Sequence, residues 1–136
     1  MRTLLIVDDH DSVLRTLEYV MSLHGYGTVL ASSGKGAIAA FEEAKVDAAL
    51  VDLHMPGIDG FQTCAELIAQ TRVQGRTLPV WLMSAAATGA AKIRAVEVGA
   101  VALLSKPFDC AEFISGMEAH FQSLSAPGIL AQAPPA

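Results

Sequence analysis

The chain has no cluster of basic residues and no long apolar run, and it contains only two cysteines. Its net charge is −5 and no basic cluster stands out. Because nonspecific binding of nucleic acid depends on such a cluster, we expect no contact with DNA or RNA. No apolar run approaches the roughly 20 residues of a membrane helix, so we expect no membrane segment. Leu4–Val7 is too short for a signal peptide and is followed at once by acids. These absences favour a cytoplasmic protein.

Cys64 and Cys110 belong to a chain that is long enough to bury a core without disulfides. We therefore expect two free thiols in a reducing compartment. Because 52% of the residues are hydrophobic and 17% are charged, the chain is expected to fold. One domain is predicted over residues 1–124, and the Ala- and Pro-rich residues 125–136 are typical of a flexible tail or a truncated linker.

Four short apolar runs each lead into side chains that can bind a metal or a phosphoryl group. Such runs are typical of strands that are buried on both faces of a parallel sheet. The carboxyl ends of parallel strands share one edge, where open α/β sheets bind their ligands. We therefore expect one crevice to hold all of these polar groups. The runs are Leu4–Val7 before Asp8 and Asp9, Ala48–Val51 before Asp52, Val80–Met83 before Ser84, and Val101–Leu104 before Ser105 and Lys106.

Segments of helical periodicity alternate with these runs and with a further strand at Thr28–Ala31. Asp11 is the expected N-cap of the first helix, and Asp109–Glu112 has the pattern of a capping box before the last. Five strand–helix units predict an α/β fold, a doubly wound five-stranded parallel sheet with helices on both faces. The predicted helices are Ser12–His24, Gly34–Ala44, Phe61–Ala69, a segment that ends near Gly99, and one that runs to about Phe121.

Asp8 and Asp9 are adjacent acids, and their mutual repulsion favours a bound cation. Oxygen ligands suit Mg²⁺, which binds one or two carboxylates and keeps several waters. In the alternative interpretation, one of the two acids only caps the following helix. The four histidines form no ligand pair on a common face, so zinc is not expected.

Asp52 also has two interpretations: it starts a turn that Met55–Gly57 completes, or it is a metal ligand and a nucleophile toward phosphorus. Ser84 and Lys106 are ordinary residues when each is considered alone. Facing the carboxylates, the hydroxyl could donate to one phosphoryl oxygen and the ammonium could balance another. Pro107 favours an extended backbone at the preceding lysine, which would direct that side chain into the crevice.

Together these residues resemble the receiver domains of bacterial two-component response regulators, the CheY-like family, whose fold is flavodoxin-like. The resemblance covers residues from about Arg2 to Phe121. It rests on four motifs in the family's order. They are Asp8-Asp9, Asp52 with Met55-Pro56-Gly57 and Asp59-Gly60, Ser84-Ala85, and Lys106-Pro107-Phe108.

The resemblance implies that Asp52 is the phosphoacceptor. Its donor would be a histidine kinase, a histidine phosphotransfer protein or a small molecule such as acetyl phosphate. Ser84 would turn toward the phosphoryl group, and Lys106 would pair with it. Mg²⁺ is the implied cofactor, and its protein ligands would be Asp8, Asp9, Asp52 and the backbone carbonyl of His54.

The implied function is a signalling switch that catalyses only its own phosphotransfer and dephosphorylation, and is not an enzyme acting on a metabolite. Phosphorylation would change the surface of the fourth helix, the fifth strand and the fifth helix, which would contact a downstream protein. In the family, the positions of His54 and Ala86 tune hydrolysis of the acyl phosphate, and an intermediate lifetime is expected here.

The chain departs from the family at Leu103, where an aromatic switch residue usually stands three positions before the lysine. Val101 and Ala102 also replace residues that are commonly polar. In one interpretation, Val101 and Leu103 pack against the fourth helix. In the other, they extend an apolar docking patch together with Val96 or Val98.

Two other functions involve similar residues or the same fold. A phosphatase of the haloacid dehalogenase type also uses Asp, Mg²⁺ and Lys, but it needs an Asp-x-Asp pattern at the first strand and a cap, and Asp8-Asp9-His10 does not match. A protein-interaction scaffold that keeps the receiver fold but needs no phosphate is the main alternative, because Leu103 replaces the switch residue.

Overall fold

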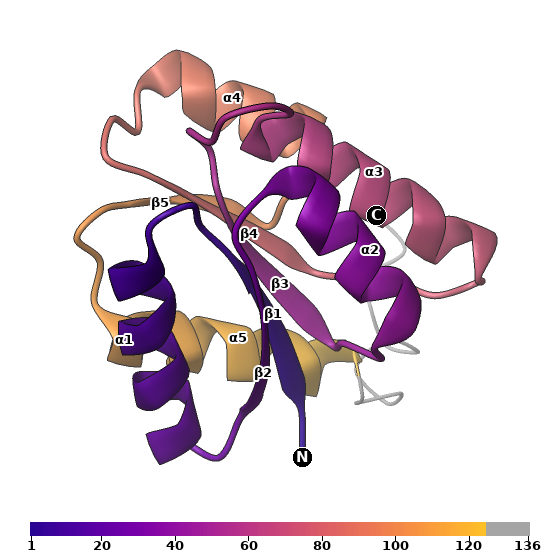
Figure 1. The fold of residues 1–136 in the computed structure, drawn as a ribbon, viewed down its shortest axis with the longest axis vertical. Coiled ribbons are helices and arrows are strands. Elements are labelled where there is room, and N and C mark those ends of the chain that lie inside the picture. The colour runs from indigo at the N-terminus through magenta and orange to yellow at the C-terminus, as the bar shows by residue number, and fades with distance from the viewer. Residues whose placement is uncertain (125–136) are drawn as a thin grey trace, which may run out of the picture. The chain divides into compact units, whose positions relative to one another are not determined.

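The computed structural model describes residues 1–124, and the tail predicted at residues 125–136 lies outside them. Strands and helices alternate along this part of the chain, as predicted (Figure 1). The chain divides into two compact units, with the boundary between Lys106 and Pro107. The elements are β1 (Thr3–Val7), α1 (Asp11–Leu23), β2 (Gly27–Ala31), α2 (Gly34–Glu43), β3 (Ala48–Asp52), α3 (Gly60–Val73), β4 (Val80–Ser84), α4 (Gly89–Glu97), β5 (Ala102–Ser105) and α5 (Cys110–Leu124).

The strands form one parallel sheet in the order β2-β1-β3-β4-β5. Within the first unit, α1 covers one face of the sheet, and α2, α3 and α4 cover the other (Figure 1). Crossovers between parallel strands are right-handed, so the direction in which the chain moves along the sheet decides which face a helix covers. This strand order therefore produces two helical layers. The predicted five-stranded parallel sheet with helices on both faces is confirmed.

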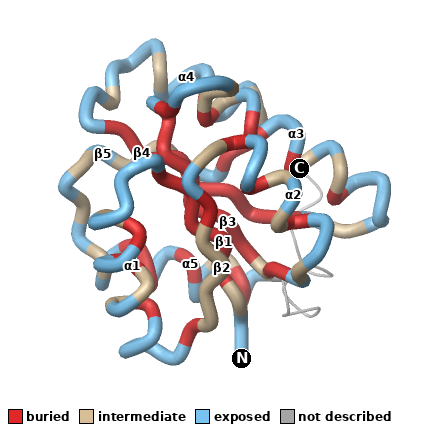
Figure 2. The backbone as a smooth tube through the Cα atoms, viewed as in Figure 1, coloured by how far each residue is buried: buried red, intermediate tan, exposed pale blue. Residues whose placement is uncertain are grey.

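The three central strands are buried along almost their whole length (Figure 2). Every residue of β3 and β4 is buried, and the partly exposed residue of β1 is Thr3. In β5, residues 102–104 are partly exposed and Ser105 is exposed. The prediction that the Val101–Leu104 run is buried on both faces is therefore wrong, because β5 is an edge strand with a neighbouring strand on one side only.

The registers place the carboxyl ends of the strands at nearly one level. Val7 pairs with Val51, so Asp8 and Asp52 both follow directly at the same edge. On the other side of β3, Asp52 pairs with Met83, and Ser84 pairs with Ser105. Backbone hydrogen bonds continue past the paired residues, because Lys106 N donates to Ser84 O at 2.8 Å. The polar residues predicted to share a crevice therefore lie at one edge of the sheet.

Side chains cap three helices of the first unit, but the predicted cap of α1 is wrong. The N-cap of α1 is His10, whose side chain makes no capping bond, and Asp11 is the first helical residue. The Asp11 carboxylate still lies in the first turn, where the helix dipole favours negative charge. The side-chain caps are Ser33 for α2, Asp59 in a reciprocal capping box with Gln62 for α3, and Thr88 for α4.

In the second unit, the Asp109 side chain caps α5, which is one half of the predicted capping box. Its Oδ1 atom accepts hydrogen bonds from the backbone N–H groups of Ala111 and Glu112 at 2.8 and 3.2 Å. The rings of Phe108 and Phe113 meet edge to face, with centroids 5.9 Å apart. The buried residues of the helix recur on one face, as expected of an amphipathic helix. They are Phe113, Ile114, Met117 and Phe121.

Within residues 1–124, none of the helices combines the length and the apolar character needed to cross a membrane.

Candidate functional site

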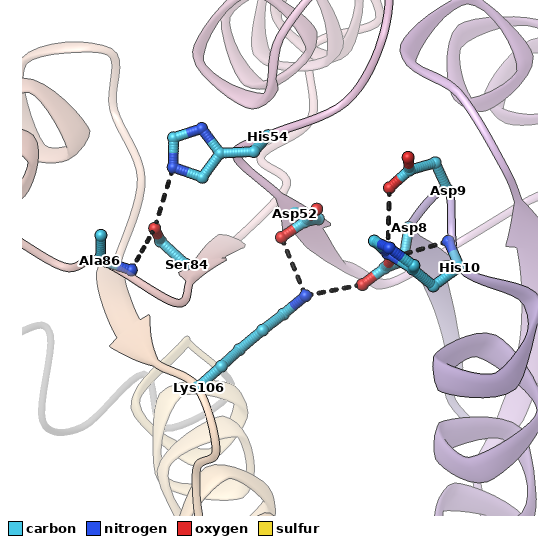
Figure 3. Close-up of polar contacts among 8 residues, drawn as sticks. All are labelled: Asp8, Asp9, His10, Asp52, His54, Ser84, Ala86 and Lys106. Atoms are coloured by element: carbon cyan, nitrogen blue, oxygen red, sulfur yellow. Dashed lines mark hydrogen bonds and ion pairs between the residues drawn. The ribbon is translucent and has the colours of Figure 1, made fainter.

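Lys106 joins two carboxylates at the carboxyl edge of the sheet (Figure 3). Its Nζ atom donates to Asp8 Oδ2 at 2.9 Å and lies 3.0 Å from Asp52 Oδ1. Asp8 is 0% exposed and Asp52 is 4% exposed, whereas the lysine side chain is 23% exposed. Lys106 therefore contacts both Asp52 and Asp8, from which it is 98 positions away in sequence, as the strand-end pattern predicts.

Burial and neighbouring opposite charge shift the pKa values of Asp52 and Lys106 in opposite directions. Burial raises the pKa of Asp52, and this effect exceeds the lowering by the Lys106 ammonium, while the nearby charges of Asp8 and Asp9 raise the pKa further. For Lys106, burial alone would lower the pKa, but hydrogen bonds and attraction from Asp8 and Asp52 together raise it. The lysine is thus held in its charged form, and three carboxylates still exceed one ammonium. The excess negative charge favours a bound cation.

Asp9 lies at the outer rim of this group and shares a partner with Asp8. The His10 Nδ1 atom is 3.1 Å from Asp8 Oδ1 and 3.2 Å from Asp9 Oδ1. The backbone N–H of His10 also donates to Asp8 Oδ1 at 2.9 Å, which fixes the carboxylate at the start of α1. Sequence reasoning missed His10. Its signal was its position directly after the acid pair, where the chain turns from β1 into α1.

The donor atoms of Asp8, Asp9 and His10 lie within 4.8 Å of one another, so they are close enough to share a metal ion. Asp52 is outside this cluster and is connected to it through Lys106. Carboxylate oxygens dominate the donors at this edge, and they are the ligands that Mg²⁺ prefers. The residues present therefore fit a hard divalent cation.

Ser84 is fully buried at the same edge, but its hydroxyl is directed away from the carboxylates. Its Oγ atom lies 3.2 Å from His54 Nε2 and accepts a hydrogen bond from the backbone N–H of Ala86 at 3.0 Å. Figure 3 shows this pair of contacts beside, and separate from, the contacts of Lys106 with Asp8 and Asp52. The structure therefore brings Asp8, Asp52 and Lys106 together and leaves Ser84 with other partners.

The start of α3 fixes the backbone that carries Asp52. The N–H of Gly60 donates to Leu53 O at 3.0 Å. A Cβ atom at Gly60 would lie only 2.5 Å from Asp52 O and 2.7 Å from Leu53 Cα. Glycine therefore allows the helix to approach the backbone of the candidate nucleophile closely, a role that the sequence pattern did not reveal.

Leu103, at the family's switch position, and the nearby valines of the predicted docking patch divide into two groups. Leu103 and Val98 are partly buried and pack against the main core cluster. Val96 and Val101 remain 68% and 41% exposed. Packing therefore accounts for Leu103, whereas the two exposed valines leave the docking hypothesis open to test.

A family model described as the response regulator receiver domain matches residues 4–118. The chain is 30% identical over 132 residues to the transcriptional regulatory protein KdpE of Mycobacterium tuberculosis. That match covers 97% of this chain and 56% of KdpE. The chain thus spans about half the length of the curated relatives it matches.

Solved structures with the same fold include a two-component response regulator from Clostridium difficile. The TM-score is 0.85 at 18% identity, over 93% of this chain and 100% of the other. The response regulator TrrA of Thermotoga maritima, solved in complex with Mg²⁺ and a beryllium fluoride, has a TM-score of 0.76 at 22% identity over 88% of this chain and 98% of TrrA. At these identities the two structures support the fold alone.

Proposed function

Because the chain belongs to the response regulator receiver domain family, we propose that it is a phosphorylation-activated switch and that Asp52 is its phosphoacceptor. The observation that carries this proposal is the contact of the buried Asp52 carboxylate with Lys106 Nζ at 3.0 Å, beside Asp8. A carboxylate held by an ammonium at a strand end is suited to take up a phosphoryl group whose charge the same ammonium then balances.

In the proposed transfer, a carboxylate oxygen of Asp52 attacks the phosphorus of a phosphohistidine. The P–N bond breaks, its electron pair stays on the imidazole nitrogen of the donor, and an acyl phosphate forms. Lys106 Nζ then donates to a phosphoryl oxygen instead of the Asp52 carboxylate, and it keeps its hydrogen bond to Asp8. Hydrolysis by water returns inorganic phosphate and the free carboxylate.

We propose Asp8, Asp9, Asp52 and the backbone carbonyl of His54 as ligands of Mg²⁺. A bound Mg²⁺ would supply positive charge that screens the carboxylates from the incoming phosphoryl group. His10 lies close enough to both acids to orient them, since its ring nitrogen contacts Asp8 and Asp9 at once. The backbone N–H of His10 donates to the Asp8 carboxylate independently of the ring, so it would hold Asp8 in place even if the ring turned away.

The proposed partners are a sensor histidine kinase or a histidine phosphotransfer protein, and a downstream protein. We propose a cytoplasmic location, which two free cysteines support. Signalling would use the surfaces of α4, β5 and α5. In this proposal the module catalyses only its own phosphotransfer and dephosphorylation.

A phosphate-independent scaffold is the second candidate. Two observations favour it: Leu103 packs into the core, where the family usually has a mobile aromatic ring, and the Ser84 hydroxyl is occupied by other partners. A scaffold would show the same partner binding with and without a phosphoryl analogue.

Beryllofluoride with MgCl₂ distinguishes these two functions. It mimics an acyl phosphate on a carboxylate, so calorimetric titration of the whole chain should show saturable binding with one equivalent. Asp52→Asn, which keeps the shape and removes the charge, should abolish the binding, and so should omission of MgCl₂. Unchanged heats in the Asp52→Asn variant would refute Asp52 as the acceptor, and absence of binding in the wild type would favour the scaffold.

A further inference from the structure

The proposed phosphotransfer does not involve the contact between His54 and Ser84, which lies near Asp52. The imidazole of His54 lies two residues beyond Asp52, in the loop after β3, and its Nε2 atom is 3.2 Å from Ser84 Oγ at the end of β4. The His54 side chain is exposed, whereas Ser84 is 0% exposed. An exposed side chain thus reaches over the edge of the sheet to a buried hydroxyl (Figure 3).

The hydroxyl of Ser84 has one proton and two lone pairs to share. The backbone N–H of Ala86 occupies one lone pair at 3.0 Å, and His54 Nε2 is its second partner. Because Ser84 is fully buried, water does not readily replace either partner, and loss of a partner leaves a buried polar group unsatisfied. The hydroxyl therefore has a definite orientation in the unphosphorylated chain, toward His54 and Ala86.

We propose that His54 is a positioning residue that holds the Ser84 hydroxyl away from the phosphoryl site until Asp52 is phosphorylated. This inference rests on the proposed function of Asp52 and adds a specific competitor for the same hydroxyl. In this proposal Ser84 donates its one proton to His54 Nε2, and because it has no second proton, a phosphoryl oxygen must replace His54 as the acceptor. The exposed imidazole can then turn into water, so its release leaves no buried group unsatisfied.

The structure also provides a reporter of this contact. The N–H of Ala86 donates to Ser84 Oγ, so its amide chemical shift depends on where that oxygen lies. If His54 holds the oxygen in place, removing the imidazole will change the Ala86 amide in the absence of any phosphoryl analogue. Loss of the imidazole ring current alone would shift this amide equally with and without the Ser84 hydroxyl, so the contact is read from the part of the shift that requires Ser84.

Two substitutions at one position separate hydrogen bonding from bulk. His54→Leu removes the hydrogen-bonding atoms at similar volume, and His54→Gln keeps a polar group within comparable reach of Ser84. We expect His54→Leu to move the Ala86 amide toward its position in Ser84→Ala and to tighten binding of beryllofluoride with MgCl₂ about fivefold, the worth of one ordinary hydrogen bond. His54→Gln should restore both values toward those of the wild type.

The double variant His54→Leu/Ser84→Ala completes the cycle. We expect that adding His54→Leu to Ser84→Ala does not increase the affinity for beryllofluoride, because the hydroxyl that His54 contacts is already absent. An Ala86 amide that is identical in the wild type and His54→Leu would overturn the proposal. Equal tightening with and without Ser84 would overturn it as well.

Different measurements test the phosphoacceptor role of Asp52 and the positioning role of His54. If wild-type protein does not bind beryllofluoride, the proposed function fails. The Ala86 amide in the free protein then decides the positioning role of His54 by itself, since that measurement needs no phosphoryl analogue.

Discussion

At the scale of single residues, Lys106 is balanced between two buried acids. Its ammonium contacts Asp8 and Asp52 at 2.9 and 3.0 Å, so neither acid is left without a counter-charge. Removing one partner of a buried charge pair costs more than the pair contributes, since the remaining charge stays buried. The lysine therefore stabilises the unphosphorylated chain and must also be released in part to a phosphoryl group.

Lys106→Met tests this dual role. We expect the free energy of unfolding without divalent cations to fall by about 1–2 kcal/mol, discounted for the partial exposure of the lysine. Mg²⁺ affinity should rise, because the acids no longer share a resident cation. Urea unfolding with and without MgCl₂ measures both. Lys92→Met, at an exposed position of α4, is the matched control and should change neither. Weaker Mg²⁺ binding in Lys106→Met would contradict this account.

The two cysteines differ in their surroundings, and their reactivity should follow. Burial raises the pKa of the Cys64 thiol to about 12, and burial together with Asp109 raises that of Cys110. Burial favours the neutral thiol, so the folded pKa of Cys64 exceeds its unfolded value of about 8.5. The stability that this neutral buried thiol contributes to the fold is therefore full below about pH 8.5 and is lost as the pH rises toward 12.

Iodoacetamide at pH 9 checks the prediction for Cys64. The partly exposed Cys110 should react first, and Cys64 should react only through unfolding, because its thiolate is suppressed and its sulfur is buried. Mass spectrometry of the Cys110→Ala variant isolates the reaction at Cys64. Rapid labelling of folded Cys110→Ala protein would show that burial of this thiol is transient.

Several single residues could be identified from the sequence, because each follows an apolar run. Asp8, Asp52 and Lys106 lie together as predicted. His10 and the His54–Ser84 contact were not predicted. Those contacts depend on side-chain rotamers and on the path of loops, which hydrophobic periodicity does not encode.

At the scale of elements, the packing of α3 against β3 requires a glycine at one point. A Cβ at Gly60 would lie 2.5 Å from a backbone oxygen and 2.7 Å from a backbone carbon, and backbone atoms yield less readily than a flexible side chain. The strand end that carries Asp52 is therefore positioned by the start of a helix.

Gly60→Ala should push α3 away from Asp52. We expect a loss of about 1–3 kcal/mol in the free energy of unfolding, typical of overpacking, and weaker binding of beryllofluoride. Gly89→Ala is the matched control: Gly89 also begins a helix, and its Cβ would meet nothing within 4 Å. That variant should be neutral or slightly stabilised. Equal stabilities of the two variants by urea unfolding would refute the close approach at Gly60.

Element boundaries from the sequence were correct to within a few residues, and the failures have physical causes. The cap of α1 was placed one residue late because Asp11 is a good N-cap by type, yet His10 occupies that position. The run at Val101–Leu104 is as apolar as the others, but its burial depends on its place in the sheet. A short apolar run does not reveal whether its strand is central or at an edge.

At the scale of the whole molecule, the fold was predictable because local pattern and topology agree. Alternating strand and helix segments with buried runs leave few arrangements other than a parallel sheet covered on both faces. The sheet order then determines which polar residues meet, since β1 and β3 are adjacent and carry Asp8 and Asp52. The site is thus a consequence of strand order as much as of residue type.

Phosphorylation of Asp52 is the step on which the proposed switch depends. The most direct measurement is the intact mass of the whole chain after incubation with MgCl₂ and acetyl phosphate or phosphoramidate. We expect a gain of one phosphoryl group that disappears in Asp52→Asn and after chelation of the metal. A gain that persists in Asp52→Asn, or no gain from either donor, would contradict it.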